Sequence, residues 1–192
     1  MSVITSSFFE PTPLEVKLTL GLGKTLLSPY YHAFARSLNL GGSERVLDFG
    51  SGSGICSGHI AELLKPDGYL DCVDISRVWH QVIQRTLKKY SHVNYYLGHL
   101  EKLHLPEDNY NLIVIHFVLH DINVKERFSI INKLSSLLKP DGRIIIREPQ
   151  NHGLTLDEME NYTKNSLLNP IKLVEKSIWF LRVYDFILQN KG

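Results

Sequence analysis

The stretch VLDFGSGSG, at Val46–Gly54, joins a short apolar run to three alternating glycines. An apolar run that ends directly in glycines is typical of a buried strand followed by a tight turn into a helix. Glycines let the backbone turn sharply and let a ligand approach the main chain closely. The stretch therefore predicts a ligand-binding loop between a strand and a helix.

The spacing of these glycines excludes two kinds of phosphate site. The dinucleotide pattern G-x-G-x-x-G would need a glycine where the chain has Ile55 or Ser57, and no Gly-Lys-Ser/Thr of a P-loop follows. Asp74 ends the next predicted strand, and a carboxylate there can accept hydrogen bonds from both hydroxyls of a ribose. Together, the loop and Asp74 predict a nucleoside ligand without a diphosphate bridge.

Outward from this stretch, apolar runs alternate with helical patterns. We expect strands at residues 45–50, 69–74, 93–98, 110–117 and 143–148, and helices at residues 55–64, 76–90, 124–138 and 155–166. Such alternation predicts an α/β fold, a doubly wound parallel sheet with helices on both faces. Ligands of such sheets bind beyond the carboxyl ends of the strands.

Turn and cap signals mark several of these boundaries. Two Lys-Pro-Asp-Gly turns, Lys65–Gly68 and Lys139–Gly142, each separate a predicted helix from a predicted strand. Thr155 and Glu158 have the spacing of a helix capping box.

The two ends of the chain differ from the alternating middle. Residues 171–180 and 183–189 are β-rich with a very short link, so they predict a hairpin whose last strand is antiparallel. Residues 1–44 contain two helical patterns, at 13–22 and 29–38, and are rich in Phe and Tyr. We expect this segment to form a helical lid.

Composition narrows the class of protein. The chain has 192 residues, 21 Lys+Arg and 20 Asp+Glu, a balance that disfavours a nucleic-acid partner and favours a small ligand. No stretch reaches the roughly 20 apolar residues of a membrane-spanning helix, and residues 1–13 lack the pattern of a secretory signal. Cys56 and Cys72 are too few for a disulfide framework. We expect a cytoplasmic protein.

Four segments in order resemble one family. VLDFGSGSG resembles the first motif of the class I S-adenosylmethionine-dependent methyltransferases, and DCVDIS at Asp71–Ser76 resembles their second. Gly98–Ile122 is similar to their third and fourth strands with the following loops, and Leu137–Pro149 is similar to the segment around their fifth strand. The resemblance covers roughly residues 40–190, and four motifs in the right order are specific together.

The resemblance implies both fold and activity. It implies a mostly parallel seven-stranded sheet with an antiparallel last strand. It also implies transfer of a methyl group from S-adenosylmethionine to a small-molecule acceptor, leaving S-adenosylhomocysteine, as in the similar quinone-biosynthesis C-methyltransferases. We expect one domain over residues 1–192, with the lid and acceptor pocket in 1–44 and the cofactor-binding core in 45–192.

The resemblance also implies a set of cofactor-binding residues. They are Asp48, Gly50, Ser51, Gly52, Gly54, Asp74, Ile75, His99, Leu100 and His116. Asp48 would orient the loop and help to hold the methionine ammonium, the glycines would make room, and Asp74 would bind the ribose hydroxyls. Ile75 would lie against the adenine ring, and His116 would face the methionine part.

The adenine edge shows one departure from the family. His99 and Leu100 would flank that edge, but the family often has Asp where this chain has His99. A neutral imidazole can accept a hydrogen bond from the adenine amino group, and a protonated one cannot.

Catalysis of methyl transfer needs mainly alignment, because the leaving group is excellent. A general base is needed only where the nucleophile must lose a proton. His120 and Glu148, which follow the fourth and fifth strands, are the catalytic candidates. The alternative for His120 is a structural or helix-capping role, and the alternative for Glu148 is that of a solvated loop acid. Tyr30 and Tyr31 either close over the sulfonium or pack a lid.

A metal site is the alternative role for the histidines. His116 and His120 are four residues apart, with His99, His104 and Asp121 nearby in sequence. Because this spacing joins two ligands only on a helix, and His116 ends a strand, we predict no metal site.

Two other functions stay open. One is a non-catalytic nucleoside-binding protein on the same fold, since fold does not establish chemistry. The other is a methyltransferase for RNA or protein, against which the near-zero charge and the lack of an Asn/Asp-Pro-Pro-Tyr motif both count.

Overall fold

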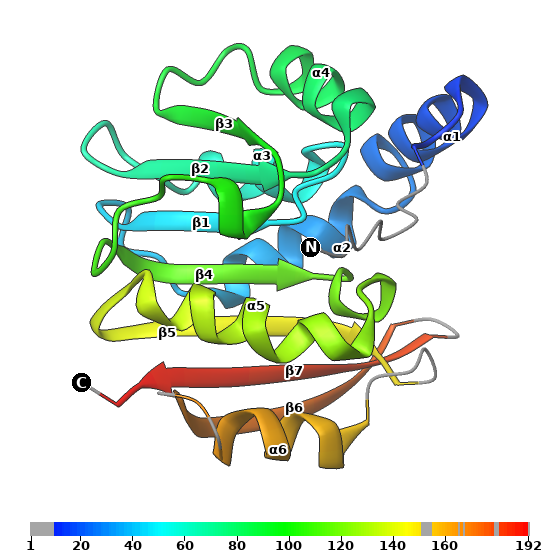
Figure 1. Ribbon diagram of the computed structural model, residues 1–192. Coiled ribbons are helices and arrows are strands. Elements are labelled where there is room, and N and C mark those ends of the chain that lie inside the picture. Colours follow the sequence, from blue (N-terminus) through cyan, green and yellow to red (C-terminus); the bar gives the residue numbers. More distant parts are fainter. Residues whose placement is uncertain (1–9, 151–154, 165, 167, 179–180, 192) are drawn as a thin grey trace, which may run out of the picture.

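Seven strands form one sheet in the order β3-β2-β1-β4-β5-β7-β6 (Figure 1). This computed structural model describes residues 10–150, 155–164, 166, 168–178 and 181–191. The strands are β1 (Arg45–Phe49), β2 (Tyr69–Asp74), β3 (Val93–Leu97), β4 (Tyr110–His116), β5 (Leu138–Pro149), β6 (Leu168–Ile178) and β7 (Leu181–Asn190). Strands β1 to β5 pair in parallel, and β7 is antiparallel to both of its neighbours. The predicted α/β sheet with an antiparallel last strand is confirmed.

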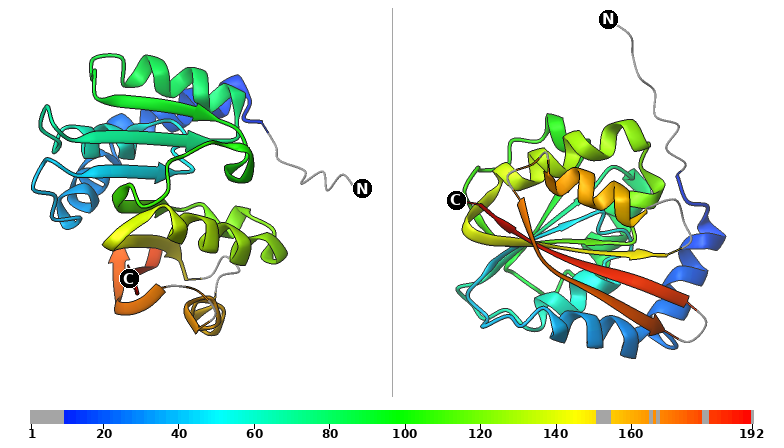
Figure 2. Two further views of the ribbon diagram at one scale, coloured as in Figure 1. Left: turned by 60° about the vertical axis from the view of Figure 1, so that its left-hand side comes forward. Right: turned by 90° about the horizontal axis from the view of Figure 1, so that it is seen from below.

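Helices cover both faces of the sheet. They are α1 (Pro13–Lys24), α2 (Ser28–Ser37), α3 (Ile55–Ala61), α4 (Arg77–Thr86), α5 (Val124–Ser136) and α6 (Leu156–Lys164), with short 3-10 turns η1 (Leu100–Lys102) and η2 (Leu119–Asp121). One apolar core joins α2, α3 and α4 to the sheet, and a second core joins α5 and α6 to the opposite face. Figures 1 and 2 show α5 and α6 on one side and α2 and α3 on the other.

The sheet order reverses between β1 and β4. Strand β1 pairs with β2 on one side and with β4 on the other. Its apolar residues Val46 and Leu47 are fully buried, as are Leu112 to Ile115 of β4, because helices cover both faces here. The glycine loop therefore opens at the switch point, where ligands of open α/β sheets bind.

The second Lys-Pro-Asp-Gly segment differs from its prediction. Lys139–Gly142 lies inside β5 instead of before it, because Leu138 already pairs with Tyr110 of β4. The register shifts between Tyr110 and Leu112, and Asp141 has a φ of 64°. The turn chemistry thus makes a bulge in a longer strand.

Strand β6 begins earlier than the predicted 171–180. Its range includes Pro170, and its register with β7 shifts between Pro170 and Lys172. Proline is tolerated because β6 is the edge strand of the sheet. Residues 179–180, at the end of the predicted strand 171–180, lie outside the described residues, as do residues 1–9 of the predicted lid.

Several helices are shorter than predicted. Helix α3 ends at Ala61 instead of residue 64, because the next amides, of Leu63 and Leu64, bond three residues back in a tightened turn. Helix α4 ends at Thr86 instead of residue 90. Along the described ranges, no helix has both the length and the apolar character needed to cross a bilayer.

Candidate functional site

The glycine loop follows β1 and is tied to the end of β2. The amides of Gly50 and Ser51 both donate to the Val73 carbonyl, at 2.8 and 3.1 Å. Gly50, Gly52 and Gly54 have φ values of 75°, 51° and 76°, a region in which side chains are strained. All three predicted glycines therefore lie where glycine is the least strained residue.

The three glycines differ in what surrounds them. A Cβ at Gly50 would meet Val118 at 2.4 Å, and one at Gly54 would meet Ile83 at 2.4 Å. A Cβ at Gly52 would meet, among the described atoms, only the Gly50 carbonyl oxygen at 4.0 Å. Gly50 and Gly54 thus permit close packing, whereas Gly52 borders open space.

Asp74 lies directly beside this open glycine. Its Oδ2 accepts from the Gly52 amide at 2.7 Å, and its Oδ1 accepts from the Ser76 amide at 2.8 Å. Burial raises the pKa of Asp74, and these backbone donors oppose the shift. Ile75 is half-buried next to it. The structure therefore brings together the glycine loop and the carboxylate expected to bind ribose.

Asp48 lies below the loop instead of on its surface. It is 2% exposed, and Ser57 Oγ donates to its Oδ2 at 2.6 Å. Burial raises the pKa of Asp48 to about 6. This placement fits the expected role in orienting the loop, through Ser57 of α3, a residue that the sequence analysis did not single out.

The two residues expected at the adenine edge lie at the start of η1. His99 is its exposed N-cap residue, and Leu100 is buried. The preceding Gly98 donates its amide to the Asp74 carbonyl at 2.9 Å, with a φ of 145°. His99 therefore lies one residue beyond a turn that is fastened to Asp74.

His116 ends β4 and packs against α2. Its Nε2 is hydrogen-bonded to the Tyr30 hydroxyl at 2.9 Å, and its ring centroid lies 4.7 Å from that of Phe34 and 5.4 Å from that of Tyr31. Burial lowers the pKa of His116 to about 3, helped by the nearby Arg147 guanidinium. His116 is therefore a neutral residue that joins β4 to α2.

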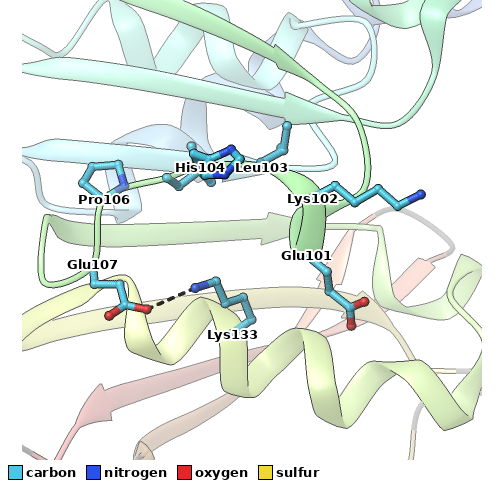
Figure 3. Close-up of a pocket in the computed structure, with 8 residues that line it drawn as sticks. Glu101, Lys102, Leu103, His104, Pro106, Glu107 and Lys133 are labelled. Atoms are coloured by element: carbon cyan, nitrogen blue, oxygen red, sulfur yellow. Dashed lines mark hydrogen bonds and ion pairs between the residues drawn. The ribbon is translucent and has the colours of Figure 1, made fainter.

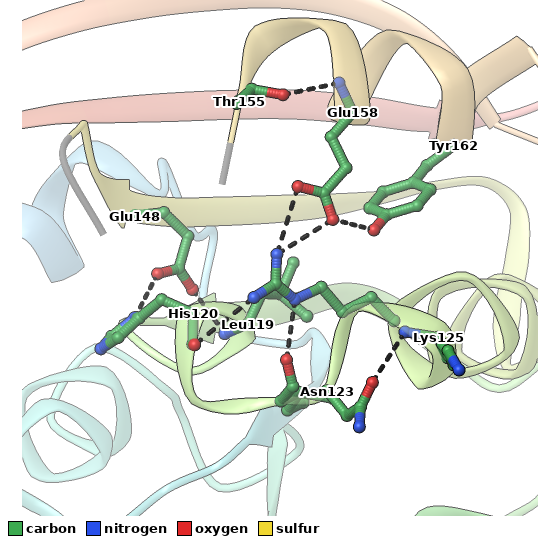
Figure 4. A network of polar contacts seen from close by, with 10 residues as sticks. Leu119, His120, Asn123, Lys125, Glu148, Thr155, Glu158 and Tyr162 are labelled. Carbon is green, nitrogen blue, oxygen red and sulfur yellow. Dashed lines mark hydrogen bonds and ion pairs between the residues drawn. The ribbon is translucent and has the colours of Figure 1, made fainter. Parts of the chain in front are cut away.

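The two catalytic candidates lie in direct contact (Figure 4). His120 Nδ1 is 2.6 Å from Glu148 Oε2, while Glu148 Oε1 accepts from the amides of Val118 and Leu119, at 2.8 and 2.6 Å. The hydrogen bond to Glu148 raises the pKa of His120. Glu148 is 1% exposed, so the alternative of a solvated loop acid is wrong.

A second buried ion pair supports this loop from α6. Arg127 Nη1 donates to Glu158 at 2.9 Å, and Arg127 Nε donates to the Ile122 carbonyl at 2.9 Å (Figure 4). Thr155 Oγ accepts from the Glu158 amide as predicted. The Glu158 carboxylate, however, contacts Arg127 and Tyr162, so only half of the predicted capping box forms.

The possible metal ligands do not gather. In the described ranges, no three His, Cys, Asp or Glu side chains have an arrangement that could hold a metal. A cavity near His104, about 600 Å³ in volume, lies between η1 and α5 and includes the Lys133–Glu107 ion pair at 3.2 Å (Figure 3). It lies on the loop between β3 and β4, apart from the glycine loop.

Sequence reasoning missed Glu10. Its carboxylate accepts from Ser76 Oγ at 2.5 Å and from the Arg77 amide at 2.8 Å, at the N-terminus of α4. Although slight burial opposes it, these hydrogen bonds lower the pKa of Glu10. The segment before α1 is thus fastened beside Asp74. No local pattern marks this contact, because 66 residues separate Glu10 from Ser76.

A doubly wound sheet with a glycine loop at its switch point, and an aspartate at the end of the neighbouring strand bonded to that loop, is typical of a nucleoside-binding α/β protein. Residues 46–142 match the family described as a methyltransferase domain. This match covers half of the chain, and the chain belongs to that family. The resemblance to the class I S-adenosylmethionine-dependent methyltransferases is thereby confirmed.

Curated proteins resemble this chain in sequence. The chain is 27% identical over 108 residues to the ubiquinone/menaquinone biosynthesis C-methyltransferase UbiE of Vibrio campbellii, covering 55% of this chain and 41% of that protein. It therefore spans about two fifths of the length of the curated relatives it matches.

Solved structures share the fold at low identity. A SAM-dependent methyltransferase from Aquifex aeolicus has a TM-score of 0.76 at 15% identity, covering 94% of this chain and 100% of that chain. Magnesium protoporphyrin IX methyltransferase from Synechocystis PCC 6803, with bound SAM, has a TM-score of 0.69 at 15% identity, covering 95% and 86%. At these identities the likeness shows the fold alone.

Proposed function

We propose that the protein transfers a methyl group from S-adenosylmethionine to a small-molecule acceptor. The observation that carries this proposal is the bond between the Gly52 amide and Asp74 Oδ2, 2.7 Å long, at the switch point of the sheet. It places a carboxylate against the loop whose glycine borders open space. Membership of the methyltransferase family supports the same chemistry.

The residues present fit this cofactor. The open side of Gly52 leaves room for a ligand against the main chain, where a side chain would project, and the loop lacks the diphosphate pattern. Asp74 would accept from the ribose hydroxyls, Ile75 would lie against adenine, and His99 with Leu100 would flank the adenine edge. When bound, S-adenosylmethionine supplies an electrophilic methyl group on a sulfonium.

The remaining chemistry belongs to the chain's own groups. We propose that Glu148 holds His120 with Nδ1 as the proton donor, so that Nε2 is the atom able to accept a proton from an acceptor. Glu148 is then a positioning residue, since it also fastens the Val118 and Leu119 amides. Such a base matters only for an acceptor that must lose a proton.

We also propose one domain over residues 1–192, in which residues 1–44 form the lid and much of the acceptor pocket. The contact of Tyr30 with His116 supports this role for α2. Removal of residues 1–30 is then expected to weaken acceptor binding more than cofactor binding. A cytoplasmic location is supported by Cys56 and Cys72, which are both buried and unpaired.

Calorimetric titration with S-adenosylmethionine and with NAD tests the cofactor. We expect the first to bind and the second not to bind. Asp74→Ala is expected to weaken binding about tenfold or more, because it removes charge-assisted hydrogen bonds. The control is Asp67→Ala, in an exposed turn at the opposite end of β2. Unchanged affinity in Asp74→Ala would contradict the ribose assignment, and failure of both ligands to bind would favour a non-catalytic role.

A further inference from the structure

A second cavity lies between α2 and the edge of the sheet. It has a volume of about 270 Å³, near the lower end for sites that hold small ligands, roughly 300–1,000 Å³. Helix α2 and strands β5 and β6 supply its walls, which are Tyr30, Ala33, Phe34, Arg147, Lys176 and Ser177. None of the expected cofactor residues lines it.

The walls of this cavity carry an excess positive charge. Arg147 Nε and Nη2 each donate to Asp185 at 2.5 Å, and Lys176 Nζ lies 2.8 Å from the same carboxylate. Arg147 and Asp185 are 2% and 4% exposed. Two cations thus share one carboxylate, which leaves one positive charge without an anion among these three groups. Because Arg147 is paired with Asp185 through two donors, this charge is that of Lys176, whose side chain is 39% exposed at the mouth of the cavity. An anionic ligand that enters the mouth would pair with this ammonium group.

Aromatic rings form the opposite wall. The Arg147 guanidinium lies over the ring of Phe34 at 4.2 Å and over the ring of Tyr30 at 5.5 Å. Its Nη1 also approaches the Tyr30 hydroxyl at 3.4 Å. Flat rings beside a flat cation favour a planar ligand with a negative end.

The cavity adjoins the carboxyl edge of the sheet. Arg147 of β5 is in register with His116 of β4, and its carbonyl accepts from the Phe117 amide at 2.9 Å. Tyr30 contacts both Arg147 and His116. A ligand in the cavity would therefore lie against the end of β4, next to the proposed methyl-transfer site. Glu148 follows Arg147 and faces the opposite side of the sheet, so the His120 proposal is tested separately.

We propose that this cavity binds the carboxylate of a small planar organic acid, and that this acid is the methyl acceptor. The proposal rests on the proposed methyltransferase function and adds the class of acceptor. Lys176, which is half-buried at the mouth, and the Arg147 guanidinium would contact the carboxylate. The rings of Tyr30 and Phe34 would lie along the planar part.

Benzoate and benzamide are matched probes, because they share a shape and differ in charge. Each probe is titrated into the whole chain, and its binding is monitored by ligand-observed NMR. We expect benzoate to bind about tenfold more tightly than benzamide, because one charge-assisted hydrogen bond contributes a free energy of about that size. Lys176→Met should abolish this preference. The control is Lys172→Met, an exposed lysine of the same strand. Circular dichroism checks that both variants fold.

Three outcomes would overturn the proposal. Equal binding of benzoate and benzamide would show that the cavity does not select charge, and an unchanged preference in Lys176→Met would show that Lys176 forms only a surface ion pair. The third outcome is that the cavity binds the carboxylate of the cofactor's own amino-acid part instead of an acceptor. In that case, Lys176→Met would weaken S-adenosylhomocysteine more than 5′-methylthioadenosine, which lacks the amino-acid part, and benzoate would compete with S-adenosylhomocysteine.

The proposed function fails in a different way. Its failure would appear as no binding of S-adenosylmethionine, while the benzoate preference and its loss in Lys176→Met would persist. That result would leave a carboxylate site and remove its role in methyl transfer. Simultaneous binding of benzoate and S-adenosylhomocysteine supports the acceptor assignment.

Discussion

The Tyr30 hydroxyl lies 2.9 Å from Nε2 of His116, although 86 residues separate them in the sequence. This bond joins α2 to the end of β4. Both side chains are half-buried, and each satisfies a polar atom of the other. Helix α2 is consequently held to the sheet by a polar bond as well as by its apolar packing.

Tyr30→Phe should destabilise the protein and loosen this wall. It leaves the buried His116 nitrogen without its partner, which typically costs about 1–3 kcal/mol. Urea unfolding should show a lower midpoint. Tyr31→Phe is the control, since that ring packs 5.4 Å from the same imidazole. Equal midpoints for Tyr30→Phe and the unaltered chain would contradict a structural role for the bond.

His116 should remain neutral in mildly acidic solution. Burial lowers its pKa to about 3, whereas the unfolded chain takes up the proton near pH 6.5. The stability contributed by neutral His116 is therefore complete above about pH 6.5 and is lost as the pH falls toward 3. Imidazole NMR should show no titration of His116 between pH 7 and 5. A titration midpoint near pH 6.5 would contradict this prediction, because it would show that the imidazole is exposed to water.

Glu148→Gln should lower the pKa of His120. The hydrogen bond to the carboxylate raises the pKa of this imidazole, and an amide carries no charge. The stabilisation from the pair is complete below the unfolded pKa and is lost as pH rises through the folded pKa. NMR titration of His120 checks the direction. Asp121→Asn, 3.5 Å away and 80% exposed, should move the pKa less. An unmoved or higher midpoint in Glu148→Gln would be inconsistent with the pair.

Gly52→Ala and Gly50→Ala should separate binding from folding. Both impose a strained φ, which costs about 1 kcal/mol or more. Gly50→Ala also places a methyl group 2.4 Å from Val118, so its unfolding midpoint should fall further. The methyl group of Gly52→Ala would point into open space, so this variant should weaken S-adenosylmethionine binding more than Gly50→Ala does. The reverse order of the two effects would exclude Gly52 from the cofactor site.

Local patterns in the sequence predicted most of the sheet. Apolar runs ending in Gly or Asp located β1 and β2, and the alternation of elements predicted their parallel pairing. Boundaries were wrong where tertiary pairing overrode local chemistry. Leu138 joins β5 because Tyr110 pairs with it, and Pro170 joins β6 because an edge strand needs fewer donors.

The site was predictable only where its residues follow strands. Asp74 and Gly52 each end or follow a strand, so the topology brings them together. Glu10 and the Arg147–Asp185 pair were missed, because each joins segments far apart in sequence. A charged residue inside an apolar run, as in RIIIRE and VYDFIL, is the signal that indicates such a buried pair.

The antiparallel course of β7 separates the two ends of the described chain. Asn190 pairs with Leu168, the first residue of β6, so it lies at the amino ends of the parallel strands, away from the glycine loop. Glu10 lies at the opposite edge, bonded to Ser76 beside Asp74. An affinity tag or surface-attachment linker placed after Asn190 would therefore leave the glycine loop and Asp74 clear, whereas one attached directly before Glu10 would emerge beside Asp74.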